Sequence, residues 1–230
     1  MIENLLYQLS KPIVKTYSGT MLKLDVKWHE QMPAGPKIIT ANHPTTTDPF
    51  FVATLFTHQI FILINEKLFK VPVFGKYLRK SGHIPVVVGK GKAAMDEALQ
   101  RLADGFTIVV FPEGALSPRE GGFCEPRTGA ARLALQSGAP VVPVGLSLNR
   151  DKVHSIITHI EGLEEEGRWY FRGPYKMTVG RPIFFRGDVE NHSYVRQVSK
   201  AIMHHIQELA FQSDERLQKG PTAFPLPEIY

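Results

Sequence analysis

The fold of this 230-residue chain is decided by residues 106–114, which read FTIVVFPEG. The residues from Phe106 to Phe111 form a nearly continuous apolar run, which is typical of a strand buried on both faces. Such strands belong to parallel sheets, which bind ligands beyond the carboxyl ends of their strands. Glu113 stands at that point, although burying a carboxylate costs stability. Its alternative interpretation is structural, as a carboxylate that accepts backbone N–H groups in the turn.

Strand-like and helix-like segments alternate on both sides of this run. We expect strands at 21–28, 37–41, 60–64, 84–88, 141–148, 170–171 and 175–185. We expect helices at about 49–57, 91–103, 129–136 and 191–211. This alternation predicts an α/β fold with a mostly parallel central sheet flanked by helices.

The length and the 43% hydrophobic content suit one globular domain, which we place at residues 19–213. Residues 1–18 carry apolar side chains at helical spacing and predict an amphipathic helix, which Pro12 should kink or divide. That helix either packs on the domain or lies in a membrane interface. Residues 214–230 are Pro-rich at their end and predict an extended C-terminal tail.

The charge balance narrows the classes of partner. The net charge of +5 suits nucleic acid, an anionic membrane or an anionic substrate. No block of five or more Lys and Arg residues appears, so nucleic acid is not favoured. The single cysteine, Cys124, excludes an intrachain disulfide and gives no metal cluster. No apolar run approaches the roughly 18–20 residues of a spanning helix, and the first residues, MIEN, do not resemble a secretory signal. We therefore expect a cytoplasmic protein.

The chemistry is indicated by residues 42–49, which read NHPTTTDP. A histidine whose second ring nitrogen is held by a carboxylate is a general base near neutral pH, so contact between His43 and Asp48 would indicate an enzyme. The alternative for Asp48 is an N-cap, with Pro49 as the first helical residue. The same spacing recurs at His159 and Glu164, in an acidic, loop-like stretch that we interpret as solvated surface.

Two further segments frame this motif. Residues 127–132, RTGAAR, open a helix with a glycine between cations and form a candidate anion site. Residues 140–144, PVVPV, predict a buried strand that we interpret as structural.

Taken together, NHPTTTD, FPEG and PVVPV resemble the glycerolipid and lysophospholipid acyltransferase family, whose best-known members are bacterial 1-acyl-glycerol-3-phosphate acyltransferases. The resemblance covers about residues 20–185. It implies transfer of a fatty acyl group from acyl-CoA or acyl carrier protein to a lysophospholipid hydroxyl, without a cofactor or a metal. It implies that His43 removes the hydroxyl proton and that Asp48 orients His43. Asn42, Glu113 and Gly114 would shape the acceptor site.

The chain departs from the family pattern at two positions. Members commonly carry Arg where this chain has Leu116, and another Arg where it has Val88. A contact between a cation and phosphate is worth about 1.5–3 kcal/mol, so both losses should weaken a phosphomonoester acceptor. The candidates for replacing this charge are Arg119, Arg127, Lys90 and Lys92. The acceptor is accordingly either 1-acyl-glycerol-3-phosphate held by Arg119 or Arg127, or a less anionic lysolipid.

The expected partners are a membrane lipid, an acyl donor and the inner face of a membrane, to which the protein would bind peripherally. Residues 1–18 and 66–80 are the candidate membrane contacts. Two other functions remain open: a non-catalytic lipid-binding module, and a hydrolase that uses His43 and Asp48 on water. A serine lipase is disfavoured because no Gly-x-Ser-x-Gly sequence is present.

Overall fold

The computed structural model describes residues 12–160 and 163–219. Seven strands form the central sheet in the order β1-β9-β6-β2-β5-β3-β4. Their bounds are β1 Asp25–Trp28, β2 Lys37–Ala41, β3 Ile60–Asn65, β4 Ile84–Val86, β5 Thr107–Val110, β6 Val141–Leu148 and β9 Tyr175–Val179. The five strands from β6 to β4 are parallel, and β9 joins β6 antiparallel. The predicted mostly parallel α/β sheet is confirmed.

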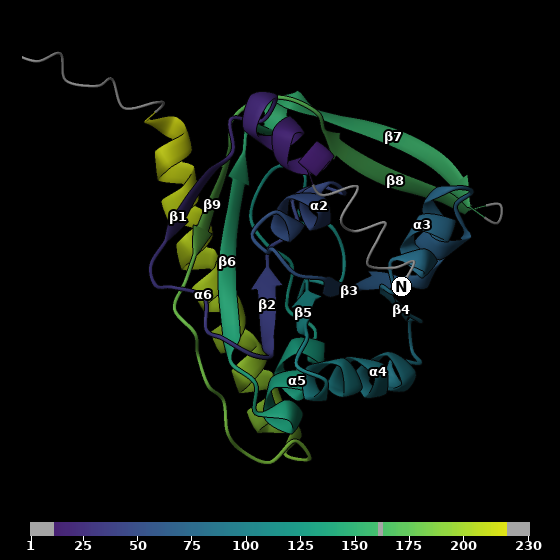
Figure 1. The fold of residues 1–230 in the computed structure, drawn as a ribbon, viewed down its shortest axis with the longest axis vertical. Coiled ribbons are helices and arrows are strands. Elements are labelled where there is room, and N and C mark those ends of the chain that lie inside the picture. The colour runs from purple at the N-terminus through teal and green to yellow at the C-terminus, as the bar shows by residue number, and fades with distance from the viewer. Residues whose placement is uncertain (1–11, 161–162, 220–230) are drawn as a thin grey trace, which may run out of the picture.

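Helices cover both faces of this sheet (Figure 1). They are α2 Asp48–Ala53, α3 Phe74–Lys80, α4 Lys92–Ala103, α5 Gly129–Ser137 and α6 His192–Gln218, with short 3₁₀ segments η1 Glu66–Lys70 and η2 Arg150–Lys152. Residues 12–20 are also helical. One apolar core joins the sheet to α4, α5 and α6. A second core joins its other face to α2 and to the two buried tyrosines, Tyr170 and Tyr175.

The central strands contribute side chains to both cores, because successive side chains of a strand point to opposite faces. On β2, Ile38 belongs to the core with α4, α5 and α6, whereas Ile39 belongs to the core with α2. Ile108 and Val109 of β5 divide in the same way. All four are fully buried. This double burial explains why the apolar runs are continuous rather than alternating.

A two-stranded antiparallel hairpin, β7 Val153–Ile160 and β8 Leu163–Tyr170, stands apart from the main sheet. Figure 1 shows it extending from the upper end of β6 over the region of α2 toward α3. An ion pair between Lys67 of η1 and Glu165 of β8 attaches it there. The loop-like interpretation of residues 159–164 is therefore wrong at its described positions, where residues 159–160 and 163–164 belong to strands.

The bounds of the elements near the two chain ends differ from those predicted. The described part of the N-terminal helix begins at Pro12, and the rest of the predicted helix lies outside the described residues. The strand predicted at 21–28 is shorter, because Lys23 has a φ of +44° and β1 starts at Asp25. Helix α6 continues to Gln218, so the tail predicted at 214–230 begins too early. The extension packs on the sheet: Arg216 donates to Asp25 at 2.7 Å.

Candidate active site

His43 and Asp48 meet beyond the carboxyl end of β2. His43 lies two residues after β2, and Asp48 is the first residue of α2. His43 Nδ1 lies 3.1 Å from Asp48 Oδ2. The Asp48 side chain is fully buried, whereas that of His43 is 18% exposed. Because Asp48 engages Nδ1, the Nε2 atom of His43 is the ring nitrogen left to take a proton from a substrate. The predicted contact is confirmed.

Three donors besides His43 fix the Asp48 carboxylate. The backbone N–H of Thr45 donates to Oδ2 at 2.7 Å, and the Thr45 hydroxyl donates to Oδ1 at 2.5 Å. The Tyr175 hydroxyl donates to Oδ1 at 2.7 Å. Burial, then the charge and hydrogen bond of Asp48, raise the pKa of Tyr175 well above 10.0, so this donor keeps its proton. Both oxygens of the carboxylate are therefore held in place.

The N-cap interpretation of Asp48 is wrong. The N-cap of α2 is Thr47, which makes no side-chain capping bond, and Pro49 follows Asp48 inside the first turn. The Asp48 carboxylate is directed back into the motif turn rather than onto the free N–H groups of the helix. Its position is thus explained by the histidine and the turn.

The imidazole of His43 packs on an aromatic ring. The ring centroids of His43 and Phe111 lie 4.1 Å apart with an interplanar angle of 24°. Phe111 follows β5, which pairs in register with β2. The run that decides the fold thereby also sets the plane of the His43 ring.

Glu113 supports the backbone of His43. It is 3% exposed, and its Oε1 accepts the His43 N–H at 2.9 Å and the Ser117 hydroxyl at 2.6 Å. Its Oε2 accepts the Cys124 N–H at 2.7 Å. These contacts match the structural alternative, in which the carboxylate accepts backbone N–H groups. Direct substrate contact by Glu113 stays a prediction.

Gly114 and Arg127 lie against one another. Gly114 has a φ of +64°, and a Cβ atom there would lie 2.5 Å from Arg127 Cδ. The Arg127 N–H donates to the Pro112 carbonyl at 2.8 Å, which attaches the segment before α5 to the Pro-Glu-Gly turn. The Arg127 side chain is exposed beside that turn. Its role in substrate binding stays a prediction.

The other two predicted site residues lie farther back or at the surface. Asn42 is buried and exchanges two hydrogen bonds with the Leu146 backbone, at 3.0 and 2.7 Å, which tie the motif to β6. Arg119 is exposed, and its carbonyl accepts from Arg150 at 3.2 Å. Substrate contact by Asn42 or Arg119 also stays a prediction.

The sequence reasoning missed the contact between the hairpin and the motif. Thr46 N–H donates to the Arg168 carbonyl at 2.7 Å, and Arg168 N–H donates to the Thr46 hydroxyl at 3.0 Å. A signal was present in residues 153–160, VHSIITHI, where β-branched residues are frequent. The second strand was not predicted because it contains the acids at 164–166, and consecutive charged residues are typical of loops.

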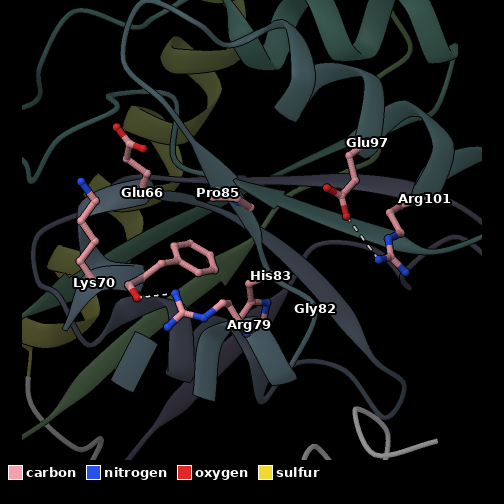
Figure 2. A pocket seen from close by; sticks show the side chains of 9 residues that line it. Glu66, Lys70, Arg79, Gly82, His83, Pro85, Glu97 and Arg101 are labelled. Carbon is pink, nitrogen blue, oxygen red and sulfur yellow. Dashed lines mark hydrogen bonds and ion pairs between the residues drawn. The ribbon is translucent and has the colours of Figure 1, made fainter. Parts of the chain in front are cut away.

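Of two pockets in the described structure, one adjoins the motif and the other does not. The smaller, about 180 Å³, is lined by Asn42, Pro44 and Arg150 among others. The larger, about 430 Å³, lies at the β4 edge of the sheet, away from His43. Figure 2 shows its lining, with Arg79 directed at the Phe69 carbonyl. Burial lowers the pKa of His83 there to about 4. None of the motif residues lines the larger pocket. We therefore place the candidate site at His43.

Comparison with known proteins agrees with this geometry. The family model described as Acyltransferase matches residues 23–147, which include the motif, the Pro-Glu-Gly turn and most of β6. The chain belongs to the Acyltransferase family. The resemblance seen in the sequence is thereby confirmed.

Part of the chain is similar to curated acyltransferases. The chain is 29% identical over 129 residues to a 1-acyl-sn-glycerol-3-phosphate acyltransferase of Pseudomonas aeruginosa, covering 54% of this chain and 49% of the relative. It is 32% identical over 134 residues to the enzyme of that name from Saccharomyces cerevisiae, covering 55% and 44%. The matches therefore span less than half of the length of these two relatives.

A solved structure has the same fold. The 1-acyl-sn-glycerophosphate acyltransferase PlsC of Thermotoga maritima superposes with a TM-score of 0.65 at 19% identity, over 91% of this chain and 82% of that one. Within residues 12–160 and 163–219, no helix is both long and apolar enough to span a bilayer.

Proposed function

We propose that the protein is an O-acyltransferase that moves a fatty acyl group from acyl-CoA or acyl carrier protein to a lysophospholipid hydroxyl. The acceptor that we favour is 1-acyl-glycerol-3-phosphate, which gives phosphatidic acid. The observation that carries the proposal is the hydrogen bond between His43 and the buried, fully fixed Asp48. The names of the relatives support the same reaction class.

The reaction proceeds by general-base catalysis. His43 Nε2 takes the proton of the acceptor hydroxyl as the hydroxyl oxygen attacks the thioester carbonyl. Asp48 holds Nδ1–H and stabilises the imidazolium that forms. Collapse of the tetrahedral intermediate breaks the carbon–sulfur bond, and the thiolate leaves with the proton from His43. The acyl group is transferred directly, so no acyl-enzyme and no cofactor is needed.

A less anionic lysolipid is the second candidate acceptor. It is favoured by Leu116 and by Val88, which is 65% exposed after β4 and brings no charge to the site. Both candidates use the same base and the same donor. They differ in the charge that the headgroup requires from the protein.

A donor and acceptor panel tests the reaction. Purified protein is given acyl-CoA or acyl carrier protein with lysophosphatidate, lysophosphatidylcholine or no acceptor. Transfer should require an acceptor, and His43→Ala should lower kcat by at least about 10³-fold. His159→Ala is the matched control and should retain activity. Release of CoA at full rate without an acceptor would instead identify a hydrolase. Lipid binding with no turnover would identify a binding module.

We also propose that the protein acts as a peripheral enzyme at the inner face of a membrane. Exposed apolar side chains support this location: Ile13 is 71% exposed, Val73 80% and Phe171 46%. Such side chains can enter the interfacial layer beside basic residues. Flotation with anionic liposomes tests it. Deletion of residues 1–18, and separately Val73→Glu, should lower recovery with the lipid. Unchanged recovery for both variants would contradict this placement.

A further inference from the structure

Arg168 of β8 is a buried cation without a counter-ion in contact. The residue is 7% exposed, and its Nε atom is buried without a hydrogen-bond partner. Within the described ranges, the guanidinium makes no ion pair with a carboxylate. Burying a charge is costly unless a partner compensates for it. A bound anion would provide that partner.

The backbone of Arg168 lies beside the motif turn, and its strand places its side chain on the face toward Tyr175 and Asp48. The backbone of Arg168 exchanges two hydrogen bonds with Thr46, inside the motif turn. Arg168 and Tyr170 share one face of β8, because side chains two positions apart point the same way. Tyr170 packs at 6.0 Å on Tyr175, whose hydroxyl binds Asp48. The Arg168 side chain is therefore on the face of β8 that adjoins this site.

A second arginine, Arg150, is held near the motif. Arg150 Nη1 donates to the carbonyls of Pro118 and Arg119, at 3.0 and 3.2 Å. Burial, and next the charge of Arg168, lower the pKa of Arg150. Arg150 also lines the smaller pocket together with Pro44 of the motif. Two like charges held in this way repel each other, and a phosphate between them would relieve the repulsion.

The geometry points to Arg168, with Arg150 beside it, as the site for the phosphate group of the acceptor lipid. This inference rests on the proposed acyl transfer. In lysophosphatidate the phosphate is carried by the carbon next to the one that bears the reacting hydroxyl. A hydroxyl at His43 therefore places the phosphate near the motif turn. The phosphates of CoA are separated from the thioester by the whole pantetheine chain. Arg168 would supply the charge that Leu116 and Val88 do not.

The test compares acceptors that differ in the phosphate alone. Arg168→Gln should raise the KM for lysophosphatidate at least about tenfold, since a charge-assisted contact is lost. The KM for the uncharged monoacylglycerol, and the KM for acyl-CoA, should stay within about twofold. Arg168→Lys should recover part of the lysophosphatidate affinity. Arg172→Gln removes one positive charge from an exposed neighbour and should change none of these values.

Several outcomes would overturn the inference. If KM rises equally for both acceptors, or kcat alone falls, Arg168 is a structural support of the motif turn. If the KM for acyl-CoA rises instead, the anion is a phosphate of the donor. A lower thermal midpoint for Arg168→Gln, with unchanged KM values, would likewise mark a structural role.

Direct binding separates this site from the proposed reaction. Calorimetry with sn-glycerol 3-phosphate should give heat with the wild-type protein and with His43→Ala, and at least about tenfold weaker binding with Arg168→Gln. If no acceptor is turned over but this pattern holds, the reaction is wrong and the phosphate site stands. If turnover is normal and binding does not depend on Arg168, the site is wrong and the reaction stands.

Discussion

The chain contains a histidine followed five positions later by an acid in two places, and the two pairs have opposite surroundings. His43 Nδ1 lies 3.1 Å from Asp48, whose side chain is fully buried. His159 Nε2 lies 3.6 Å from Glu164, and these two side chains are 67% and 71% exposed. Equal spacing in the sequence therefore produces contact in both cases but a fixed geometry in only one.

The difference lies in what holds the acid. Asp48 accepts from Thr45 twice and from Tyr175 once, so its orientation is fixed before a substrate arrives. His159 and Glu164 are opposite each other across β7 and β8, and their contact follows from the strand register. Water competes for both of those side chains. A catalytic pair needs the first arrangement, because a base that must be oriented during the reaction loses rate.

The two pairs should differ most in how kcat responds when the acid of each pair loses its charge. Asp48→Asn should lower kcat by about 10³-fold, because an amide beside Nδ1 favours the wrong imidazole tautomer. Glu164→Gln is the matched change and should leave kcat unchanged. Steady-state kinetics checks both, and circular dichroism verifies that each variant folds. An Asp48→Asn enzyme within tenfold of the wild type would remove Asp48 from the catalytic pair.

The next largest effect concerns Glu113, which holds the backbone of His43. Glu113→Gln replaces one acceptor oxygen by a donor that faces N–H groups, so kcat should fall by about 10–10²-fold. The free energy of unfolding should fall by about 1–3 kcal/mol, since buried partners are left unsatisfied. Glu166→Gln on the exposed face of β8 is the control. Urea denaturation and kinetics measure the two effects. If KM for the acceptor changes instead of kcat, Glu113 contacts substrate directly.

The element bounds that sequence predicted best are those of the buried strands. The bounds of β2 and β6 agree with residues 37–41 and 141–148, because apolar, β-branched runs ended by polar or Gly-Pro segments leave little freedom. The His43–Asp48 contact was also predictable, since a short turn joins the two residues. Helix α2 ends earlier than predicted, at Ala53, where Thr54 and the residues that follow form a turn.

The contacts that sequence could not predict are made by residues distant along the chain. Tyr175 lies 127 positions from Asp48, and nothing in its local pattern indicates a hydrogen bond to the motif. The strand of Arg168 was missed for a different reason, because it contains three consecutive acids. Helix α6 was cut short at Phe211, which is itself 62% exposed, although Ser213 beyond it is fully buried. In each case tertiary burial, rather than local propensity, decided the outcome.

A smaller effect is expected for Tyr175→Phe, which removes one of the donors to Asp48. We expect kcat to fall by about three- to tenfold, because the remaining donors still hold the carboxylate. Tyr170→Phe is the control, since its hydroxyl donates to the Pro174 carbonyl instead. A kcat loss as large as that of Asp48→Asn would mean that Tyr175, rather than the turn, positions Asp48.

Tyr175 also predicts how stability depends on alkaline pH. Burial first, and then Asp48, raise the pKa of Tyr175 in the folded protein well above the 10.0 of an unperturbed tyrosine. Above about pH 10 the unfolded chain loses this proton while the folded protein keeps it, so stability falls as pH rises. The wild type should therefore lose stability more steeply above pH 10 than Tyr175→Phe. The free energy of unfolding is measured by chemical denaturation at several pH values. If it falls equally with pH in both proteins, the Tyr175 hydroxyl does not have a raised pKa.

The smallest effect is expected at the exposed pair itself. In a double-mutant cycle of His159→Ala and Glu164→Gln, the coupling in the free energy of unfolding should be at most about 0.5 kcal/mol. The cycle is measured at low ionic strength and again in 1 M salt, which should abolish the coupling. A coupling that exceeds about 1 kcal/mol and survives salt would mean that spacing alone can build a strong pair. In that event, burial and the Thr45 and Tyr175 donors would no longer distinguish His43, the proposed base, from His159.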